Sequence, residues 1–79
     1  MYYAYALQSL KDGQLYVGIS ADPERRLKEH NSGGTRSTKA RRPFKLIYVE
    51  ECAHRRHARE REKYLKSGCG REFLKSKLC

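Results

Sequence analysis

Five side chains of this 79-residue chain have types and spacings that suit the hydrolysis of a phosphodiester bond. They are two tyrosines, Tyr5 and Tyr16, an arginine and a histidine four positions apart, Arg26 and His30, and a later carboxylate, Glu62. Phosphodiester cleavage needs a group that accepts a proton, a cation that stabilises developing negative charge, and a carboxylate that holds a metal ion. We therefore expect these five residues to form a catalytic site.

The two tyrosines lie in neighbouring segments with the composition of β-strands. Residues 2–7 and 15–20 are rich in aromatic and β-branched side chains, and Lys11-Asp12-Gly13-Gln14 between them is typical of a hairpin turn. In an antiparallel hairpin with an even-residue loop, Tyr5 and Tyr16 fall on the same face. That face, which also carries Gly18 and Ser20, is predicted to form the floor of a site. The other face is predicted to enter the core with Ala4, Ala6, Leu15, Val17 and Ile19.

Arg26 and His30 are predicted to share one face of a helix. Asp22-Pro23-Glu24 is a strong helix start, because Asp can cap, Pro suits the first turn and Glu complements the positive end of the helix dipole. The helix is expected to end at about Asn31. Side chains four residues apart lie on the same side of a helix, with Leu27 as the apolar anchor.

Glu62 belongs to a second predicted helix, residues 54–66. Together with Ala58 and Leu65 it lies on the stripe expected to face the sheet, where an unpaired carboxylate would be costly. We therefore expect a partner for Glu62, such as Arg26, a tyrosine hydroxyl or a metal ion. The alternative is an ion pair with Lys66, four residues further along the helix.

The remaining elements complete a small α/β (α+β) fold. A third strand is predicted over residues 44–49, Gly68 is predicted to end the second helix, and a short last helix is predicted over 71–77. Alternation in the third strand places three side chains on one face, namely Phe44, Leu46 and Tyr48. We expect a three-stranded antiparallel sheet flanked by helices, in the order β-β-α-β-α-α, within a single domain over 1–79.

The net charge points to a polyanion as partner. The chain has 18 Lys and Arg against 9 Asp and Glu, which gives a charge of +9. Neutralising phosphates releases counterions, so we expect DNA as the partner, and RNA also fits. Residues 32–42 are predicted to form a mobile basic loop that contacts the phosphate backbone. The predicted nucleic-acid contacts are Arg36, Lys39, Arg41 and Arg42, together with Lys66.

The N-terminal apolar stretch and the cysteines predict a cytoplasmic protein. The stretch is short and interrupted by polar residues, so it is interpreted as neither a signal peptide nor a membrane span. The cysteines are few and their number, three, is odd, which argues against a disulfide framework and for a reducing compartment. A structural zinc site is an alternative role for four residues whose spacing matches no familiar zinc template, namely Cys52, His54, His57 and Cys69.

Taken together, these motifs resemble the GIY-YIG endonuclease superfamily, and within it the small stand-alone bacterial proteins described as excision-repair-nuclease-like. The resemblance covers essentially the whole chain and is carried by Tyr16-Val17-Gly18, by Arg26 to Asn31, and by the segments 42–48, 58–66 and 67–74. The first motif, Gly-Ile-Tyr in the family, is here Tyr3-Ala4-Tyr5. Only its tyrosine is retained, and Tyr3 is an alternative to Tyr5 on the same face.

The resemblance implies a metal-dependent DNA endonuclease that hydrolyses phosphodiester bonds, with branched, single-stranded or damaged DNA as substrates in DNA repair or processing. A divalent cation, Mg²⁺ or Mn²⁺, would be held by Glu62, waters and a phosphate oxygen. Tyr5 or Tyr16 would accept a proton from the attacking water. Arg26 would stabilise developing charge, and His30 would orient a tyrosine or shuttle a proton.

Two other functions stay open at this point. The chain could bind nucleic acid without cutting it, or it could be a nuclease that acts only with a partner protein or a DNA-binding subunit. The sequence does not fix the oligomeric state.

Overall fold

The structure is a computed structural model, and it describes residues 1–34 and 39–77. Its strands are β1 (Tyr2–Ser9), β2 (Leu15–Ser20) and β3 (Phe44–Cys52), which form an antiparallel sheet in the order β2-β1-β3. Its helices are α1 (Pro23–Asn31), α2 (Arg55–Lys66) and α3 (Gly68–Ser76), with a short 3-10 helix, η1 (Lys39–Arg41), between α1 and β3. The expected α+β fold and the order β-β-α-β-α-α are confirmed, and η1 replaces part of the segment predicted as a loop.

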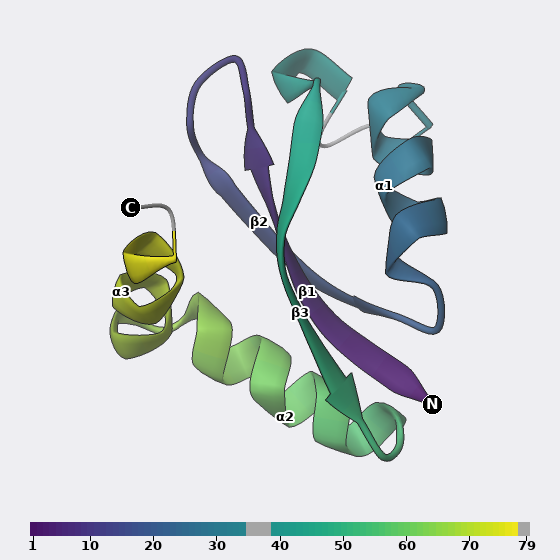
Figure 1. The fold of residues 1–79 in the computed structure, drawn as a ribbon, viewed down its shortest axis with the longest axis vertical. Helices are drawn as coiled ribbons and strands as arrows, with labels where there is room; N and C mark the ends of the chain where they lie inside the picture. Colours follow the sequence, from purple (N-terminus) through teal and green to yellow (C-terminus); the bar gives the residue numbers. More distant parts are fainter. Residues whose placement is uncertain (35–38, 78–79) are drawn as a thin grey trace.

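Both faces of the sheet are covered by helices. Figure 1 shows α1 on one side of the sheet, with α2 and α3 on the other. The α1 side buries Tyr5, Leu7 and Phe44, with Leu27 of α1 packed against them. The α2 side buries an apolar cluster made of Ala4, Ala6, Val17, Cys52, Ala58, Leu65 and Leu74. The tyrosine face, which is predicted to form the floor of a site, is therefore also a second core, because α1 packs on it.

The hairpin register places the two candidate tyrosines on the same face, as predicted. Tyr5 pairs with Gly18, and Leu7 pairs with Tyr16, so these side chains point to the same side of the sheet. The turn is closed by two backbone hydrogen bonds between Ser9 and the residues that follow it, to Gln14 and from Gly13. Because the parity of the pairing is fixed, a slip of one residue would move Tyr16 to the opposite face.

A β-bulge in β3 divides that strand between the two cores. Ala6 pairs with Tyr48, whereas the next residue of β1, Leu7, pairs with Leu46, so Ile47 is an extra residue. Leu46 therefore packs on the α1 side and Tyr48 on the α2 side. The predicted common face of Phe44, Leu46 and Tyr48 is wrong for this reason, because one extra residue reverses the alternation.

The helix that carries Arg26 and His30 begins and ends where the sequence predicts. The Asp22 side chain accepts a hydrogen bond from the Arg25 backbone N–H at 3.2 Å, and Pro23 occupies the first turn. At the other end, the Asn31 side chain bonds both backbone groups of Phe44. Its Oδ1 accepts from the N–H at 2.6 Å, and its Nδ2 donates to the carbonyl at 3.1 Å. These two bonds fix the last turn of α1 against the start of β3.

The α2–α3 corner differs from the prediction. Ser67 is both the last cap of α2 and the first cap of α3, where its hydroxyl accepts a hydrogen bond from the Gly70 backbone N–H at 3.2 Å. Gly68 therefore begins α3 instead of only ending α2, and α3 starts three residues before the predicted Arg71. A Cβ at Gly70 would lie 2.0 Å from the Tyr64 carbonyl oxygen, so only glycine allows the two helices to approach this closely.

Candidate active site

Tyr5 and Gly18 form the centre of the candidate site. Tyr5 is only 1% exposed, and its ring crosses the backbone of the edge strand β2. A Cβ at Gly18 would lie 2.7 Å from the Tyr5 hydroxyl oxygen and 2.9 Å from the ring carbon that bears it. The absence of a side chain at Gly18 therefore makes the space in which the Tyr5 hydroxyl lies.

Arg26 and Glu62 act on this phenol from two helices on opposite faces of the sheet. Burial raises the pKa of Tyr5 above 10.0, a hydrogen bond from the Arg26 guanidinium opposes that shift, and the charge of Glu62 adds to it. Tyr16 also interacts electrostatically with Tyr5. The structure thus brings Tyr5, Tyr16, Arg26 and Glu62 into one electrostatic neighbourhood.

Arg26 is held by two partners. Its Nη1 is 3.0 Å from Oε2 of Glu29, one turn further along α1, and the Arg26 side chain is 37% exposed. The hydrogen bond to Tyr5 raises the pKa of Arg26, so the guanidinium stays charged. Glu29 was not among the predicted site residues, although its spacing of three residues from Arg26 on a helix indicates such a pair. A cation that is partly exposed and directed to the phenol can also contact a phosphate.

His30 is fully buried and packs against Tyr16. The two ring centroids are 4.7 Å apart, and the Phe44 ring lies 5.9 Å from the imidazole on the other side. Burial lowers the pKa of His30 below 6.5, and the charge of Arg26 lowers it further. His30 is therefore neutral near pH 7 and sits where it can fix the orientation of Tyr16.

Glu62 pairs with Lys66, which was the alternative considered for this carboxylate. Oε2 of Glu62 is 3.3 Å from the Lys66 Nζ, and the Glu62 side chain is 18% exposed. Lys66 is a flexible and more exposed side chain, 55% exposed, so a cation of higher charge can replace its ammonium group. A carboxylate is an oxygen donor, which fits Mg²⁺ or Mn²⁺ when waters and substrate phosphate supply the other oxygens.

Comparison with known proteins shows the family of the chain. Residues 1–72 match the model of the GIY-YIG catalytic domain. The chain belongs to the GIY-YIG family. This is a nuclease family, and the chain has its helix motif Arg26 to Asn31 and the tyrosine and glycine of its second motif, Tyr16 and Gly18.

Small proteins from several bacteria are similar to the chain. It is 43% identical over 67 residues to a UPF0213 protein of Clostridium perfringens, covering 84% of this chain and 71% of that one. It is 39% identical over 75 residues to a UPF0213 protein of Staphylococcus saprophyticus, covering 94% and 90%. The solution NMR structure of the UPF0213 protein BH0048 from Bacillus halodurans aligns with a TM-score of 0.55 and 36% identity, covering 96% of this chain and 84% of that one.

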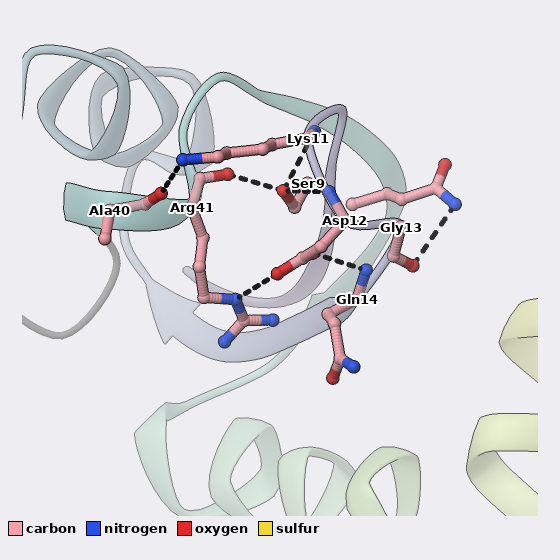
Figure 2. A network of polar contacts seen from close by, with 8 residues as sticks. Ser9, Lys11, Asp12, Gly13, Gln14, Ala40 and Arg41 are labelled. Carbon is pink, nitrogen blue, oxygen red and sulfur yellow. Dashed lines mark hydrogen bonds and ion pairs between the residues drawn. The ribbon is translucent and has the colours of Figure 1, made fainter.

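Ala40 and Arg41, near the end of the predicted basic loop, are anchored to the hairpin turn in this GIY-YIG domain. Arg41 Nε is 3.3 Å from Asp12 Oδ2, Lys11 Nζ donates to the Ala40 carbonyl at 3.2 Å, and the Ser9 hydroxyl donates to the Arg41 carbonyl (Figure 2). Arg41 is thus directed to Asp12, a contact between residues 29 positions apart. The exposed side chains of Lys39 and Arg42 lie beside this anchor, and Arg36 lies outside the described residues.

The residues considered for zinc have other contacts in the GIY-YIG fold. Cys52 is buried at the end of β3, and the His54 side chain caps α2 by accepting from the His57 backbone N–H. Cys69 is exposed on α3. Within residues 1–34 and 39–77, no group of three or more His, Cys, Asp or Glu side chains could hold a metal ion.

No helix of this described part is long and apolar enough to cross a membrane.

Proposed function

We propose that this GIY-YIG protein is a metal-dependent endonuclease that hydrolyses phosphodiester bonds in DNA. One observation carries the proposal: the Tyr5 hydroxyl lies in the space above Gly18, a hydrogen bond from Arg26 lowers its burial-raised pKa, and the charge of Glu62 acts on it from α2. The first group can handle a proton, the second can stabilise negative charge and the third can hold a cation.

In the proposed hydrolysis, water attacks the phosphodiester and a tyrosine of this chain accepts the proton. The oxygen of a water molecule forms a bond to phosphorus, the bond to the 3′ oxygen breaks, and the products are a 5′-phosphate and a 3′-hydroxyl. The water proton passes to a tyrosine phenolate, and the leaving oxygen takes a proton from solvent. Burial raises the pKa of Tyr5 overall, and the hydrogen bond from the Arg26 guanidinium opposes that shift by favouring the phenolate, so Tyr5 is one candidate for the proton acceptor. Tyr16, held against His30, is the other candidate.

Arg26 would also stabilise the charge that develops on the phosphate in the transition state. A preorganised guanidinium in a partly buried position needs little rearrangement during the reaction, which is the source of such stabilisation. Glu62, with waters and a phosphate oxygen, would hold Mg²⁺ or Mn²⁺. Such an ion supplies positive charge that polarises the phosphodiester and lowers the pKa of bound water.

A cleavage assay with a matched pair of variants tests the proposal. Purified protein is incubated with Mg²⁺ or Mn²⁺ and with single-stranded, duplex, flap and four-way-junction DNA. We expect Glu62→Gln to lower the cleavage rate by about a hundredfold or more, as removal of one electrostatic group in an active site does. Glu72→Gln removes the same charge from an exposed position on α3 and should cleave like the natural protein.

Each outcome separates the candidate functions. Cleavage that Glu62→Gln abolishes while DNA affinity is retained supports the endonuclease, and the preferred DNA shape shows whether it is selective for branched substrates of repair. DNA binding with no cleavage under either metal contradicts the proposal and favours a binding module or an enzyme that needs a partner subunit. The Glu62–Lys66 ion pair is the observation that favours this second function, since it gives the carboxylate a structural partner.

A further inference from the structure

The outer face of α2 carries cations that the candidate active site does not use. Two cations of α2 are paired with carboxylates: Arg61 forms two hydrogen bonds with Glu50, and Lys66 pairs with Glu62. Four others are exposed and form no ion pair within residues 1–34 and 39–77. This group, which we name the α2 basic stripe, comprises Arg55, Arg56, Arg59 and Lys63.

The stripe is a continuous surface. Its four cations line one shallow groove together with a single acidic residue, Glu60. Arg55, Arg59 and Lys63 are separated by four residues each, so they follow one side of the helix over a length of about 12 Å. Glu62 is on the same helix, and its neighbour Arg61 faces β3 through Glu50. The stripe therefore runs along the solvent side of the helix that supplies the candidate metal ligand.

Helix stability does not account for these residues. Like charges four residues apart on a helix repel each other, and two such pairs occur here, Arg55 with Arg59 and Arg59 with Lys63. Arg55 and Arg56 also lie in the first turn, which contains no acidic residue, next to the positive end of the helix dipole. Arg55, Arg56 and Arg59 thus stand where like charge or the helix dipole disfavours them, whereas Lys63 lies in the last turn, where the dipole favours a cation. An anionic partner would remove the repulsion among these cations.

We propose that the α2 basic stripe binds the phosphate backbone of duplex nucleic acid. This inference rests on the proposed function in taking nucleic acid as the partner. The spacing favours a polyphosphate over a single anion, because four cations spread along two turns of helix can each meet a different phosphate. The stripe is separate from the surface around Lys39 and Arg42, since α2 and η1 lie at opposite ends of the molecule (Figure 1). The protein then has two phosphate-binding surfaces, one at each end of the sheet.

Binding of a linear fluorescent duplex, measured in EDTA so that no cleavage occurs, tests this surface. The variant replaces all four residues of the stripe by glutamine, which keeps high helix propensity. A control removes four charges from exposed positions elsewhere, as Lys28→Gln, Lys45→Gln, Arg71→Gln and Lys77→Gln. The slope of log K against log salt is negative, and we expect its magnitude to be smaller by about 3 to 4 in the stripe variant, at roughly 0.9 for each lost phosphate contact. The control should change the slope by less than about 1, and the stripe variant should melt at the same temperature as the natural protein or higher.

The result that overturns the inference is a stripe variant whose affinity and salt slope change no more than those of the control. A variant that unfolds would be replaced by the pair Arg59→Gln and Lys63→Gln, which leaves the first turn intact and should lower the slope by about 2. The proposed function fails in a different way. A protein that binds DNA through the stripe but never cleaves it would reject the endonuclease and leave this surface established.

Discussion

Replacing Gly18 by alanine is the most direct perturbation of the candidate site, because it adds one methyl group where the Tyr5 hydroxyl lies. The new Cβ would be 2.7 Å from that oxygen, about 0.7 Å short of ordinary contact. Tyr5 is 1% exposed and cannot move into solvent. We expect the free energy of unfolding to fall by about 1–3 kcal/mol, the usual cost of an overpacked core. We expect DNA cleavage to fall about a hundredfold, since that is the scale for a reacting group misplaced by about 1 Å.

Two measurements on the same samples check this prediction. Urea unfolding followed by circular dichroism gives the stability, and initial rates of DNA cleavage in Mn²⁺ give the activity. Gly68→Ala is the control, because a Cβ there meets nothing within 4 Å and Gly68 begins a helix. The double variant Tyr5→Phe with Gly18→Ala removes the closest contact, so it should recover part of the stability and none of the activity.

The result that would refute the reasoning is a Gly18→Ala protein with the stability and cleavage rate of the natural one. The Tyr5 hydroxyl would then not occupy the space above Gly18, and the link between Tyr5, Arg26 and Glu62 would lose its geometric basis. Loss of stability with full activity would place Tyr5 in the core only. In that case Tyr16 would become the candidate for the catalytic phenol.

Three further predictions concern pH and the opposite face of the sheet. Because the pKa of Tyr5 is raised, the cleavage rate should rise about tenfold per pH unit between pH 7 and 9, as the phenolate fraction does; a flat profile would reject a phenolate base. Because burial lowers the pKa of His30, the free energy of unfolding should fall as the pH drops below 6.5. Urea unfolding of His30→Gln should lack this His30-dependent loss of stability. Burial raises the pKa of Glu50, but hydrogen bonds from Arg61 and Tyr48 outweigh burial and lower the pKa overall. Glu50→Gln should therefore lower the free energy of unfolding in urea by about 1–2 kcal/mol. No change would show that the Glu50–Arg61 pair contributes nothing to stability.

Local signals in the sequence predicted most of the elements and the position of the tyrosines. The hairpin parity placed Tyr5 and Tyr16 on one face, because strand alternation depends only on counting residues across the turn. The Asp22-Pro23 start of α1 was also predictable, since capping involves residues within three positions of one another. These features are determined by residues close together in the chain, so they can be predicted from a single sequence.

Features that depend on distant residues were not predictable. The bulge at Ile47 follows from how β3 meets β1, and no glycine marks it in the sequence. The Arg41–Asp12 pair joins residues 29 positions apart, so Arg41 was interpreted only as a phosphate contact. In the site, spacings along each helix were predictable from the sequence, but the influence of Glu62 on Tyr5 from another helix depends on how the whole sheet is assembled. Gly68 follows the end of α2, as predicted, but it also begins α3, which the residue type alone did not indicate.

The shared cap at Ser67 has a consequence for how such chains can change in length during evolution. α2 and α3 follow each other without a loop, and Gly70 touches the backbone of Tyr64 and Leu65. One inserted residue at this corner would rotate α3 by about 100° and replace that contact with a clash. Insertions and deletions should therefore be excluded from residues 67–70 in relatives that keep this corner, and should instead accumulate in the exposed hairpin turn.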